Sequence, residues 1–294
     1  MAEITAGAVK ALREATGAGM MACKEALGQT NGDVKEATKL LREKGLADAA
    51  KRAGRTAAEG RIVFAKTADG RSALIMELNC ETDFAAKNDA FGAAADSIAG
   101  KLLTGSFASQ EAVEGTPTGD EVKALSAKIG EKVTLRRFAK IAAPADGLLV
   151  EYLHHNQKIG VLLAASGPET GREVLRQVAM HVAAIQPVCI DRAGVNPEAV
   201  AAEKEIARTQ AKESGKPEKI WDKIIEGKLG KYYEQICLLE QAYVHDDKQK
   251  VGNVLKAAGL TVTGMQLFIL GEGIEKKQVD LAKEVEKELS KYGS

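Results

Sequence analysis

The sequence predicts an α+β protein that is rich in helix and built from several small units. Alanine, the best intrinsic helix former, makes up more than a third of the apolar residues. The apolar pattern changes from helical spacing to alternation and back along the chain, which indicates both helices and strands. Only 6 Phe, 5 Tyr and 1 Trp occur among the 294 residues, so we expect thin cores that small side chains fill.

Residues 1–55 predict a compact module of three short helices. Gly17-Ala18-Gly19 separates the first helix from the second, and Asn31-Gly32-Asp33 supplies a turn and an N-cap for the third. We expect Gly45 to end the third helix, because glycine is a poor helix former and is common just past helix ends. A further helical stretch, 46–53, then leads into a linker.

Residues 56–142 predict a first α+β unit of the core. Two runs of alternating or apolar residues flank Asp69-Gly70, which is a strong signal for a β-hairpin turn. An Ala-rich helical segment and a loop rich in Gly, Ser, Thr and Pro follow this hairpin. In chain order we expect strands 61–66 and 72–79, the segment 81–84 followed by a helical segment that ends near 103, a loop 106–120, a helix 121–129 and a strand 132–141.

The sequence pattern predicts a second α+β unit over residues 143–194 and 236–274. An antiparallel helical hairpin over 195–235 is inserted between its two parts. An apolar stripe on the second hairpin helix fits self-association or packing within the chain. A charged terminal helix is expected within 275–294. In chain order we expect strands 148–153 and 159–165, helices 169–185, 197–213, 217–239 and 251–258, and a strand 260–270.

Charge and apolar patterning exclude several classes of partner. The 41 Lys+Arg residues cancel the 41 Asp+Glu residues, so the chain lacks the basic footprint of a nucleic-acid-binding protein. No run of apolar residues is long enough for a transmembrane helix, so we expect no membrane partner. The first ten residues lack the pattern of a secretory signal, and the four cysteines are far apart. These features favour a reduced, cytoplasmic protein.

Catalytic, metal and nucleotide motifs are also missing from the sequence. No histidine or cysteine pair has the spacing of metal ligands, and no nucleophile motif occurs. Gly17-Ala18-Gly19 and Gly271-Glu272-Gly273 lack the context of a phosphate-binding loop, so both are interpreted as turns. We therefore expect no metal, no cofactor, no direct nucleotide binding and no covalent chemistry. His181 is interpreted as a packed or hydrogen-bonded helix residue.

Two short segments are candidates for binding. The first is Asn79-Cys80-Glu81-Thr82-Asp83-Phe84, where a strand ends just before one of the six phenylalanines. Either Asp83 caps a helix and Phe84 packs back on the sheet, or the acid and the aromatic ring project side by side. The second is Met20-Met21, which fits either a core position or a partner-facing surface, since methionine adapts to both.

Collinear blocks along nearly the whole chain resemble the bacterial elongation factor Ts family. The strongest blocks are Thr16–Leu27 (TGAGMMACKEAL) and Leu78–Asp89 (LNCETDFAAKND). The resemblance implies a ubiquitin-associated-like fold for the N-terminal helices, a two-part core, a dimerisation module at 195–235 and a C-terminal helical module. Further matching blocks are Lys128–Ile141, Tyr152–Leu162, Ala179–Ala184, Ser214–Ile220 and Gly271–Lys276.

The resemblance also implies a set of partner-binding residues. The exchange motif of the family, Thr-Asp-Phe-Val, falls on Thr82, Asp83, Phe84 and Ala85, with alanine in place of valine. In the family the aromatic ring enters an apolar pocket between helices of the GTPase elongation factor Tu, and the acid lies near its Mg²⁺. Secondary docking residues implied in the same way are His154, Met20, Met21, Lys10 and Arg13. His155 departs from the family pattern, which often has glycine there.

The implied function is guanine-nucleotide exchange. Binding to the GDP form of elongation factor Tu would displace Mg²⁺ and promote release of GDP for exchange with GTP. The alternative is a binding or chaperone module for a GTPase that does not catalyse exchange. Residues 195–235 are expected to support a homodimer or a two-plus-two complex.

Overall fold

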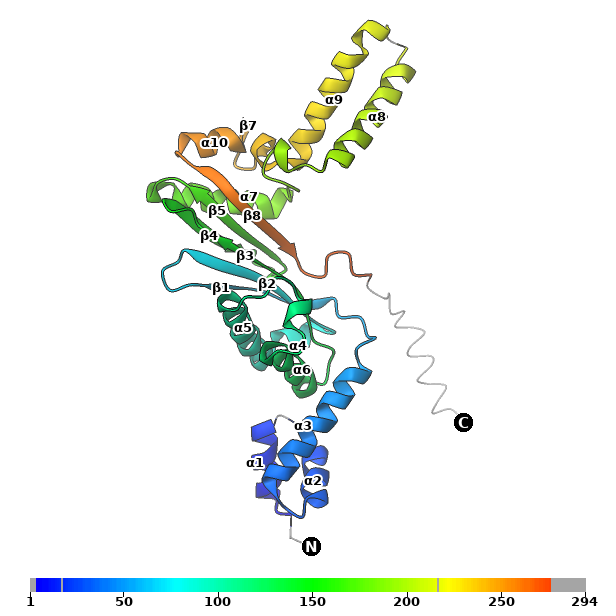
Figure 1. Ribbon diagram of the computed structural model, residues 1–294, viewed down its shortest axis with the longest axis vertical. Coiled ribbons are helices and arrows are strands. Elements are labelled where there is room, and N and C mark those ends of the chain that lie inside the picture. The colour runs from blue at the N-terminus through cyan, green and yellow to red at the C-terminus, as the bar shows by residue number, and fades with distance from the viewer. Residues whose placement is uncertain (1–3, 17, 216, 276–294) are drawn as a thin grey trace.

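The computed structural model describes residues 4–16, 18–215 and 217–275, and the side chains of four residues near the end of the third helix are not described. The α+β class is confirmed, because helices and antiparallel sheets both make up large parts of the fold. The molecule is elongated, with three helices at one end, two sheets in the middle and a helical hairpin at the other end (Figure 1). Among the described residues no helix is long and apolar enough to cross a membrane.

The N-terminal helices are α1 (Ala6–Thr16), α2 (Met20–Gln29) and α3 (Val34–Lys51). Their apolar faces meet in a small core that includes Leu12, Cys23 and Leu27. The expected cap of α3 is present, since Asp33 Oδ1 accepts hydrogen bonds from the N–H groups of Lys35 (2.8 Å) and Glu36 (3.1 Å).

The expectation that Gly45 ends the third helix is wrong. Helix α3 runs through Gly45 to Lys51 without a break. The reason is a tertiary contact, because a Cβ atom at Gly45 would lie 2.9 Å from the Cβ of Ala127 on helix α6 (Pro117–Ile129). Glycine is therefore needed for the close approach of the two helices, and this packing outweighs its low helix propensity of about 1 kcal/mol.

The first sheet has the strand order β1-β2-β3, with β1 at Glu59–Lys66, β2 at Ser72–Cys80 and β3 at Thr134–Ala142. One face packs on helices α4 (Asp83–Lys87), α5 (Asp89–Thr104) and α6 (Pro117–Ile129). The expected loop ends earlier than predicted, because Thr116 caps α6 and Pro117 occupies its first turn. A short 3-10 turn at Glu111–Val113 also lies within that loop.

The second sheet has the order β4-β5-β8, with β4 at Gly147–Leu153, β5 at Ile159–Ser166 and β8 at Thr261–Ile269. Helices α7 (Arg172–Ile185) and α10 (Val251–Ala257) cover its outer face. The two sheets pack face to face, so the core has helices outside and sheets inside (Figure 1). A small hairpin of β6 (Ala242–Tyr243) and β7 (Asp246–Lys250) was not expected from the sequence.

The inserted hairpin consists of α8 (Pro197–Glu213) and α9 (Trp221–Ile236). Helix α8 has the expected bounds. Helix α9 is shorter than expected at both ends, because Glu218–Ile220 form a 3-10 turn before it and Cys237 has extended backbone after it. Ala207, Ala211 and Ile225 are buried on the two helices. The expected terminal helix lies mostly outside the described residues.

Candidate functional site

The turn between β2 and α4 carries the most exposed aromatic side chain among the described residues. Phe84 is 81% exposed, while the next two residues, Ala85 and Ala86, are buried in the core of the first unit. Thr82 caps the helix, since its Oγ1 accepts a hydrogen bond of 3.2 Å from the N–H of Ala85. The projecting interpretation of Phe84 is therefore correct, and the interpretation with Asp83 as cap and Phe84 packed on the sheet is wrong.

Glu131, which no sequence motif singles out, anchors this turn. One of its oxygens accepts from the N–H groups of Glu81 (3.0 Å) and Thr82 (2.9 Å), and the other accepts from Thr82 Oγ1 (2.6 Å). In return, Glu81 Oε1 accepts from the N–H of Lys132 at 2.6 Å. The turn before α4 is thus tied to the turn before β3. The sequence offers one local signal for Glu131, which is its position directly after Gly130. Gly130 is the C-cap of α6 and has a positive φ of 79°.

Asp83 lies beside Phe84 on the surface. Its Oδ2 accepts a hydrogen bond of 2.6 Å from Lys87 Nζ, one helical turn away. This hydrogen bond lowers the pKa of Asp83, so the carboxylate is charged at neutral pH. An acidic group and an apolar ring therefore stand next to each other on one short helix.

The turn between β4 and β5 carries the two neighbouring histidines. The hydroxyl of Tyr152 and Nδ1 of His154 form a hydrogen bond of 3.0 Å, which orients the imidazole ring of His154. The ring centroids of His154 and His155 are 4.1 Å apart. The left-handed residue of this turn is Gln157, with φ of 57°, so His155 does not occupy the position that favours glycine.

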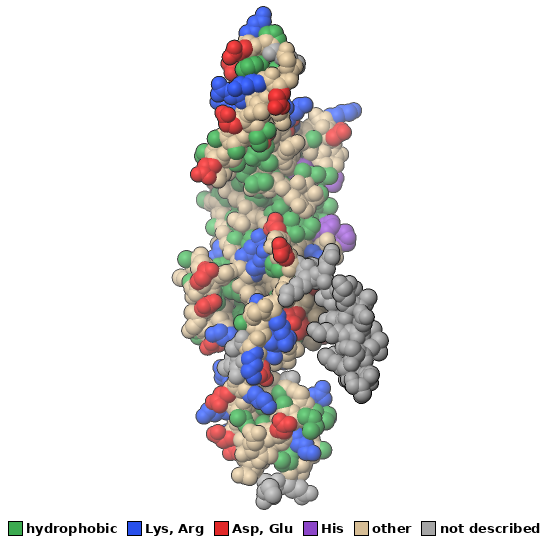
Figure 2. Space-filling model, turned by 90° about the vertical axis from the view of Figure 1, so that its right-hand side faces the viewer, with side chains coloured by type: hydrophobic (Ala, Val, Ile, Leu, Met, Phe, Trp, Pro, Cys, Tyr) green, Lys and Arg blue, Asp and Glu red, His purple; other side chains and the backbone are tan. Residues whose placement is uncertain are grey.

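The structure brings this turn close to α4. A shallow cavity of about 240 Å³ is lined by Asp83 and Lys87 on one side and by His155 and Gln157 on the other. Histidine side chains lie along one edge of the core, next to hydrophobic side chains (Figure 2). The start of α4 and the histidine turn, which are about 70 positions apart in the sequence, therefore lie next to each other on the surface.

The N-terminal candidates lie on a separate module. Met20 is 58% exposed and Met21 is 65% exposed, so the interpretation of the two methionines as core residues is wrong. Lys10 and Arg13 are exposed on α1. Lys10 Nζ lies 3.9 Å from Glu14 Oε1 on the same helix. All four candidate residues are exposed on the N-terminal module, at the opposite end of the molecule from the helical hairpin (Figure 1).

His181 lies buried in α7, as expected. Its Nε2 donates a hydrogen bond of 2.9 Å to Gln241 Oε1, and its Nδ1 accepts one of 3.2 Å from the N–H of Val244. Burial lowers the pKa of His181, which keeps the ring neutral. Within the described part of the chain, no three His, Cys, Asp or Glu side chains are grouped so that they could hold a metal ion.

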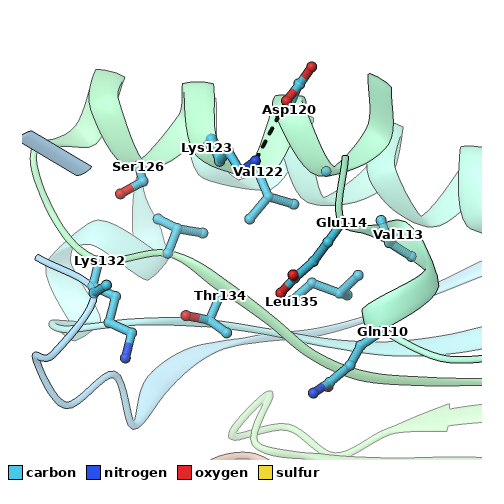
Figure 3. Close-up of a pocket in the computed structure, with 13 residues that line it drawn as sticks. Gln110, Val113, Glu114, Asp120, Val122, Lys123, Ser126, Lys132, Thr134 and Leu135 are labelled. Atoms are coloured by element: carbon cyan, nitrogen blue, oxygen red, sulfur yellow. Dashed lines mark ion pairs between the residues drawn. The ribbon is translucent and has the colours of Figure 1, made fainter. Parts of the chain in front are cut away.

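A larger cavity of about 660 Å³ lies between α6, the 3-10 turn before it and the start of β3 (Figure 3). Glu114 points toward Leu135, and Asp120 pairs with Lys123 at 3.8 Å on α6. None of the candidate binding residues lines this cavity. The exposed candidate residues therefore lie away from this cavity, on two modules.

Fold and surface together define a modular α+β protein that exposes large apolar side chains beside charged groups on two of its modules. The sequence profile of the family described as Elongation factor TS matches residues 81–272. The protein "Elongation factor Ts" of Methylococcus capsulatus is 45% identical over 288 residues, which cover 96% of this chain and 97% of that protein. The chain belongs to the elongation factor Ts family of translation factors.

Proposed function

We propose that the protein is a guanine-nucleotide exchange factor of translation elongation. It binds elongation factor Tu in its GDP form, displaces Mg²⁺ and promotes the release of GDP, which GTP then replaces. Family membership supports this proposal. The observation that carries it is Phe84, which is 81% exposed beside the charged Asp83 on a firmly anchored turn.

The free energy for exchange comes from burial of Phe84 in the partner. Moving a phenylalanine side chain from water into an apolar pocket contributes roughly 1.5–3 kcal/mol, which is available to separate two helices of the GTPase. Mg²⁺ requires nearly octahedral oxygen geometry, so a small helix shift in the GTPase weakens its binding. GDP then loses a counter-charge and dissociates faster.

This coupling is reciprocal, because a factor that lowers the affinity for nucleotide must itself be displaced by nucleotide. The protein therefore acts as a catalyst of exchange without a covalent step. Ala85 fits this scheme because its side chain is buried in the core of the first unit and anchors α4, while Thr82 caps the helix.

The remaining candidates provide secondary contacts. We assign His154, held by Tyr152, to the same partner surface as Phe84. Met20, Met21, Lys10 and Arg13 form a docking surface on the N-terminal module, where adaptable methionines meet exposed basic groups. Residues 195–235 serve contacts between two copies in a homodimer or a two-plus-two complex, and sedimentation with and without this segment tests that role.

The test is the release of fluorescent GDP from elongation factor Tu. We expect the wild-type protein to accelerate release and Phe84→Ala to lose most of that acceleration. Ile185→Ala is a matched control, since Ile185 is an apolar side chain at the end of α7 with 47% exposure. A wild-type protein that does not accelerate release would contradict the proposal, and a fully active Phe84→Ala would contradict the role of this ring. The non-exchanging alternative predicts a complex whose lifetime is independent of added nucleotide.

A further inference from the structure

Two of the four cysteines meet at the base of the helical hairpin. Cys189 follows α7, Cys237 follows α9, and their Sγ atoms are 3.6 Å apart. The other two, Cys23 and Cys80, lie in the cores of the N-terminal module and of the first α+β unit. The pair is 48 positions apart in sequence, so only the fold brings the thiols together.

The backbone around the pair has the geometry of neighbouring strands. Cys189 and Cys237 form an isolated parallel β-bridge. The N–H of Leu238 donates to the carbonyl of Cys189 (2.9 Å), and the N–H of Leu239 donates to that of Ile190 (3.0 Å). Neighbouring strands lie about 4.8 Å apart. Disulfides span Cα separations of about 4.4–6.8 Å. A disulfide can therefore form here without a large movement of the backbone.

We propose that Cys189 and Cys237 are an oxidisable dithiol that forms a reversible disulfide across the base of the helical hairpin. The bond closes a loop that contains the whole of α8 and α9, and it joins the end of α9 covalently to the segment after α7. In the reduced protein this junction depends on the backbone hydrogen bonds and on a small apolar cluster of Cys189, Val195 and Cys237.

The oxidant is a low-molecular-weight disulfide, such as oxidised glutathione. The Cys189 thiolate attacks one sulfur of the oxidant, which forms a mixed disulfide and releases one thiol. The Cys237 thiolate then attacks the Cys189 sulfur and releases the second thiol. The protein loses two protons and two electrons, and the oxidant gains both. Cys189 reacts first because it is 9% exposed, whereas Cys237 is fully buried.

The surroundings of the thiols make this reaction slow. Burial raises the pKa of both cysteines, and that of Cys237 to about 12. Little thiolate is present at neutral pH, so reaction follows local opening of the hairpin base. The pair therefore responds to a sustained oxidising environment and not to a brief one. Once formed, the bond fixes the base from which the hairpin projects.

The test is incubation of the full-length protein with oxidised glutathione, followed by thiol counting after denaturation and by mapping of peptides under non-reducing conditions. We expect two of the four thiols to disappear, a link between Cys189 and Cys237, and reversal by dithiothreitol. Hydrogen exchange at the amides of Leu238 and Leu239 should slow by about tenfold or more in the oxidised protein. Four remaining thiols, or a link that involves other cysteines or two chains, would overturn the proposal.

Two variants separate the steps. Cys237→Ser should accumulate glutathione on Cys189, because the thiol that resolves the mixed disulfide is missing. Cys23→Ser, a buried cysteine in another module, should still form the bond. If Cys237→Ser and the wild-type protein accumulate the same mixed disulfide, the two thiols do not act as a pair. Because peptide mapping of the wild-type protein needs no variant, the result does not depend on the folding of either variant.

Discussion

Glu131 accepts three hydrogen bonds from the segment that carries Phe84, and it does so from a turn about 50 positions further along the chain. Such bonds to a charged acceptor fix the direction in which α4 leaves the sheet. The exposure of Phe84 therefore depends on the turn before α4 and also on the turn before β3 that contains Glu131. In the proposed complex, a Phe84 ring without this support would have to become ordered on binding, and this ordering would reduce the binding free energy.

Replacement of Glu131 tests this support. Glu131→Ala leaves the N–H groups of Glu81 and Thr82 without their partner, so we expect a loss of about 1–3 kcal/mol in the free energy of unfolding. We also expect a weaker acceleration of GDP release, measured with the same assay as for Phe84→Ala. Glu114→Ala removes an exposed carboxylate and should change stability by less than about 0.5 kcal/mol. Equal effects of the two variants would contradict the role of Glu131.

His181 gives the protein a pH-dependent term in its stability. Burial is the main cause that lowers its pKa from the ordinary value of 6.5, with a smaller effect of His245 in the same direction and an opposing effect of Gln241. The unfolded chain therefore binds a proton more readily than the folded one. The stabilising contribution is complete above pH 6.5 and is lost as the pH falls below that value.

The measurement is the free energy of unfolding of the wild-type protein across this range of pH. We expect stability to decline below the ordinary pKa of histidine, because protonated Nδ1 cannot accept the hydrogen bond from Val244. His181→Gln should flatten this part of the profile, whereas His155→Gln, at an exposed position, should leave it unchanged. An identical decline in His181→Gln would assign the pH dependence to another group.

At the scale of elements, a buried carboxylate joins the two sheets. Glu77 of β2 is fully buried, and it accepts hydrogen bonds from Arg136 (2.9 Å), Arg137 (2.6 Å) and the N–H of Gly271 (2.8 Å). Arg137 also donates to the carbonyl of Ile269 at the end of β8 (2.9 Å). Burial alone would raise the pKa of Glu77, but the hydrogen bonds from Gly271 and the two arginines outweigh it and lower the pKa.

Removal of this carboxylate should be costly, because two partly buried guanidinium groups and the N–H of Gly271 lose a buried, charged acceptor. We expect Glu77→Ala to lower the free energy of unfolding by about 3–5 kcal/mol. Glu151→Ala is a matched control, since Glu151 of β4 pairs with Lys66 of β1 across the same two sheets at 3.1 Å, with 38% and 41% of the side chains exposed. An exposed pair contributes about 0–1 kcal/mol. Denaturant unfolding of both variants compares the two, and a small effect of Glu77→Ala would contradict the buried junction.

The elements that the sequence predicts well are those with local signals. Helix α8 has its expected bounds because Asn196 caps it and Pro197 begins it, and both signals lie within the segment. The prediction for Gly45 is wrong because glycine is needed there for close contact with Ala127, which lies on another helix. Strand β7 escaped prediction because its sequence, DDKQK, is polar and its burial pattern is almost wholly exposed.

The same distinction applies to the candidate site. The sequence drew attention to Phe84, but its local pattern allowed both an inward and an outward ring. The outward ring follows from Ala85 and Ala86, which fill the inward positions of α4, and from Glu131, which is distant in sequence. Long-range hydrogen bonds of this kind leave no periodic signal, so only the fold could reveal them.

For the whole molecule, the arrangement of its modules decides which surfaces can meet a partner together. The candidate docking surfaces lie on the N-terminal helices and on the core, and the contact between α3 and α6 connects the two. Arg52, just after α3, adds a hydrogen bond of 3.2 Å to the carbonyl of Ser126 on α6. The net charge of the chain is zero, which fits a protein that binds another protein through a few contacts of complementary shape.

Gly45 tests whether this connection matters. A Cβ atom at position 45 would lie 2.9 Å from the Cβ of Ala127, so Gly45→Ala must push α3 away from α6. We expect weaker protection of the linker after α3 against limited proteolysis, and slower GDP release because the two docking surfaces no longer meet the partner in one geometry. Helix propensity alone would have the opposite effect, because replacing glycine by alanine within a helix stabilises the folded protein by up to about 1 kcal/mol.

Gly100→Ala on α5 supplies the comparison, because a Cβ atom there meets nothing within 4 Å. This variant should be slightly more stable than the wild-type protein and fully active in exchange. The two substitutions are chemically identical and both lie in helices, so a difference between them reports the contact with Ala127 alone. If Gly45→Ala were as stable and as active as Gly100→Ala, the N-terminal module would not need its close contact with α6 to act together with the core.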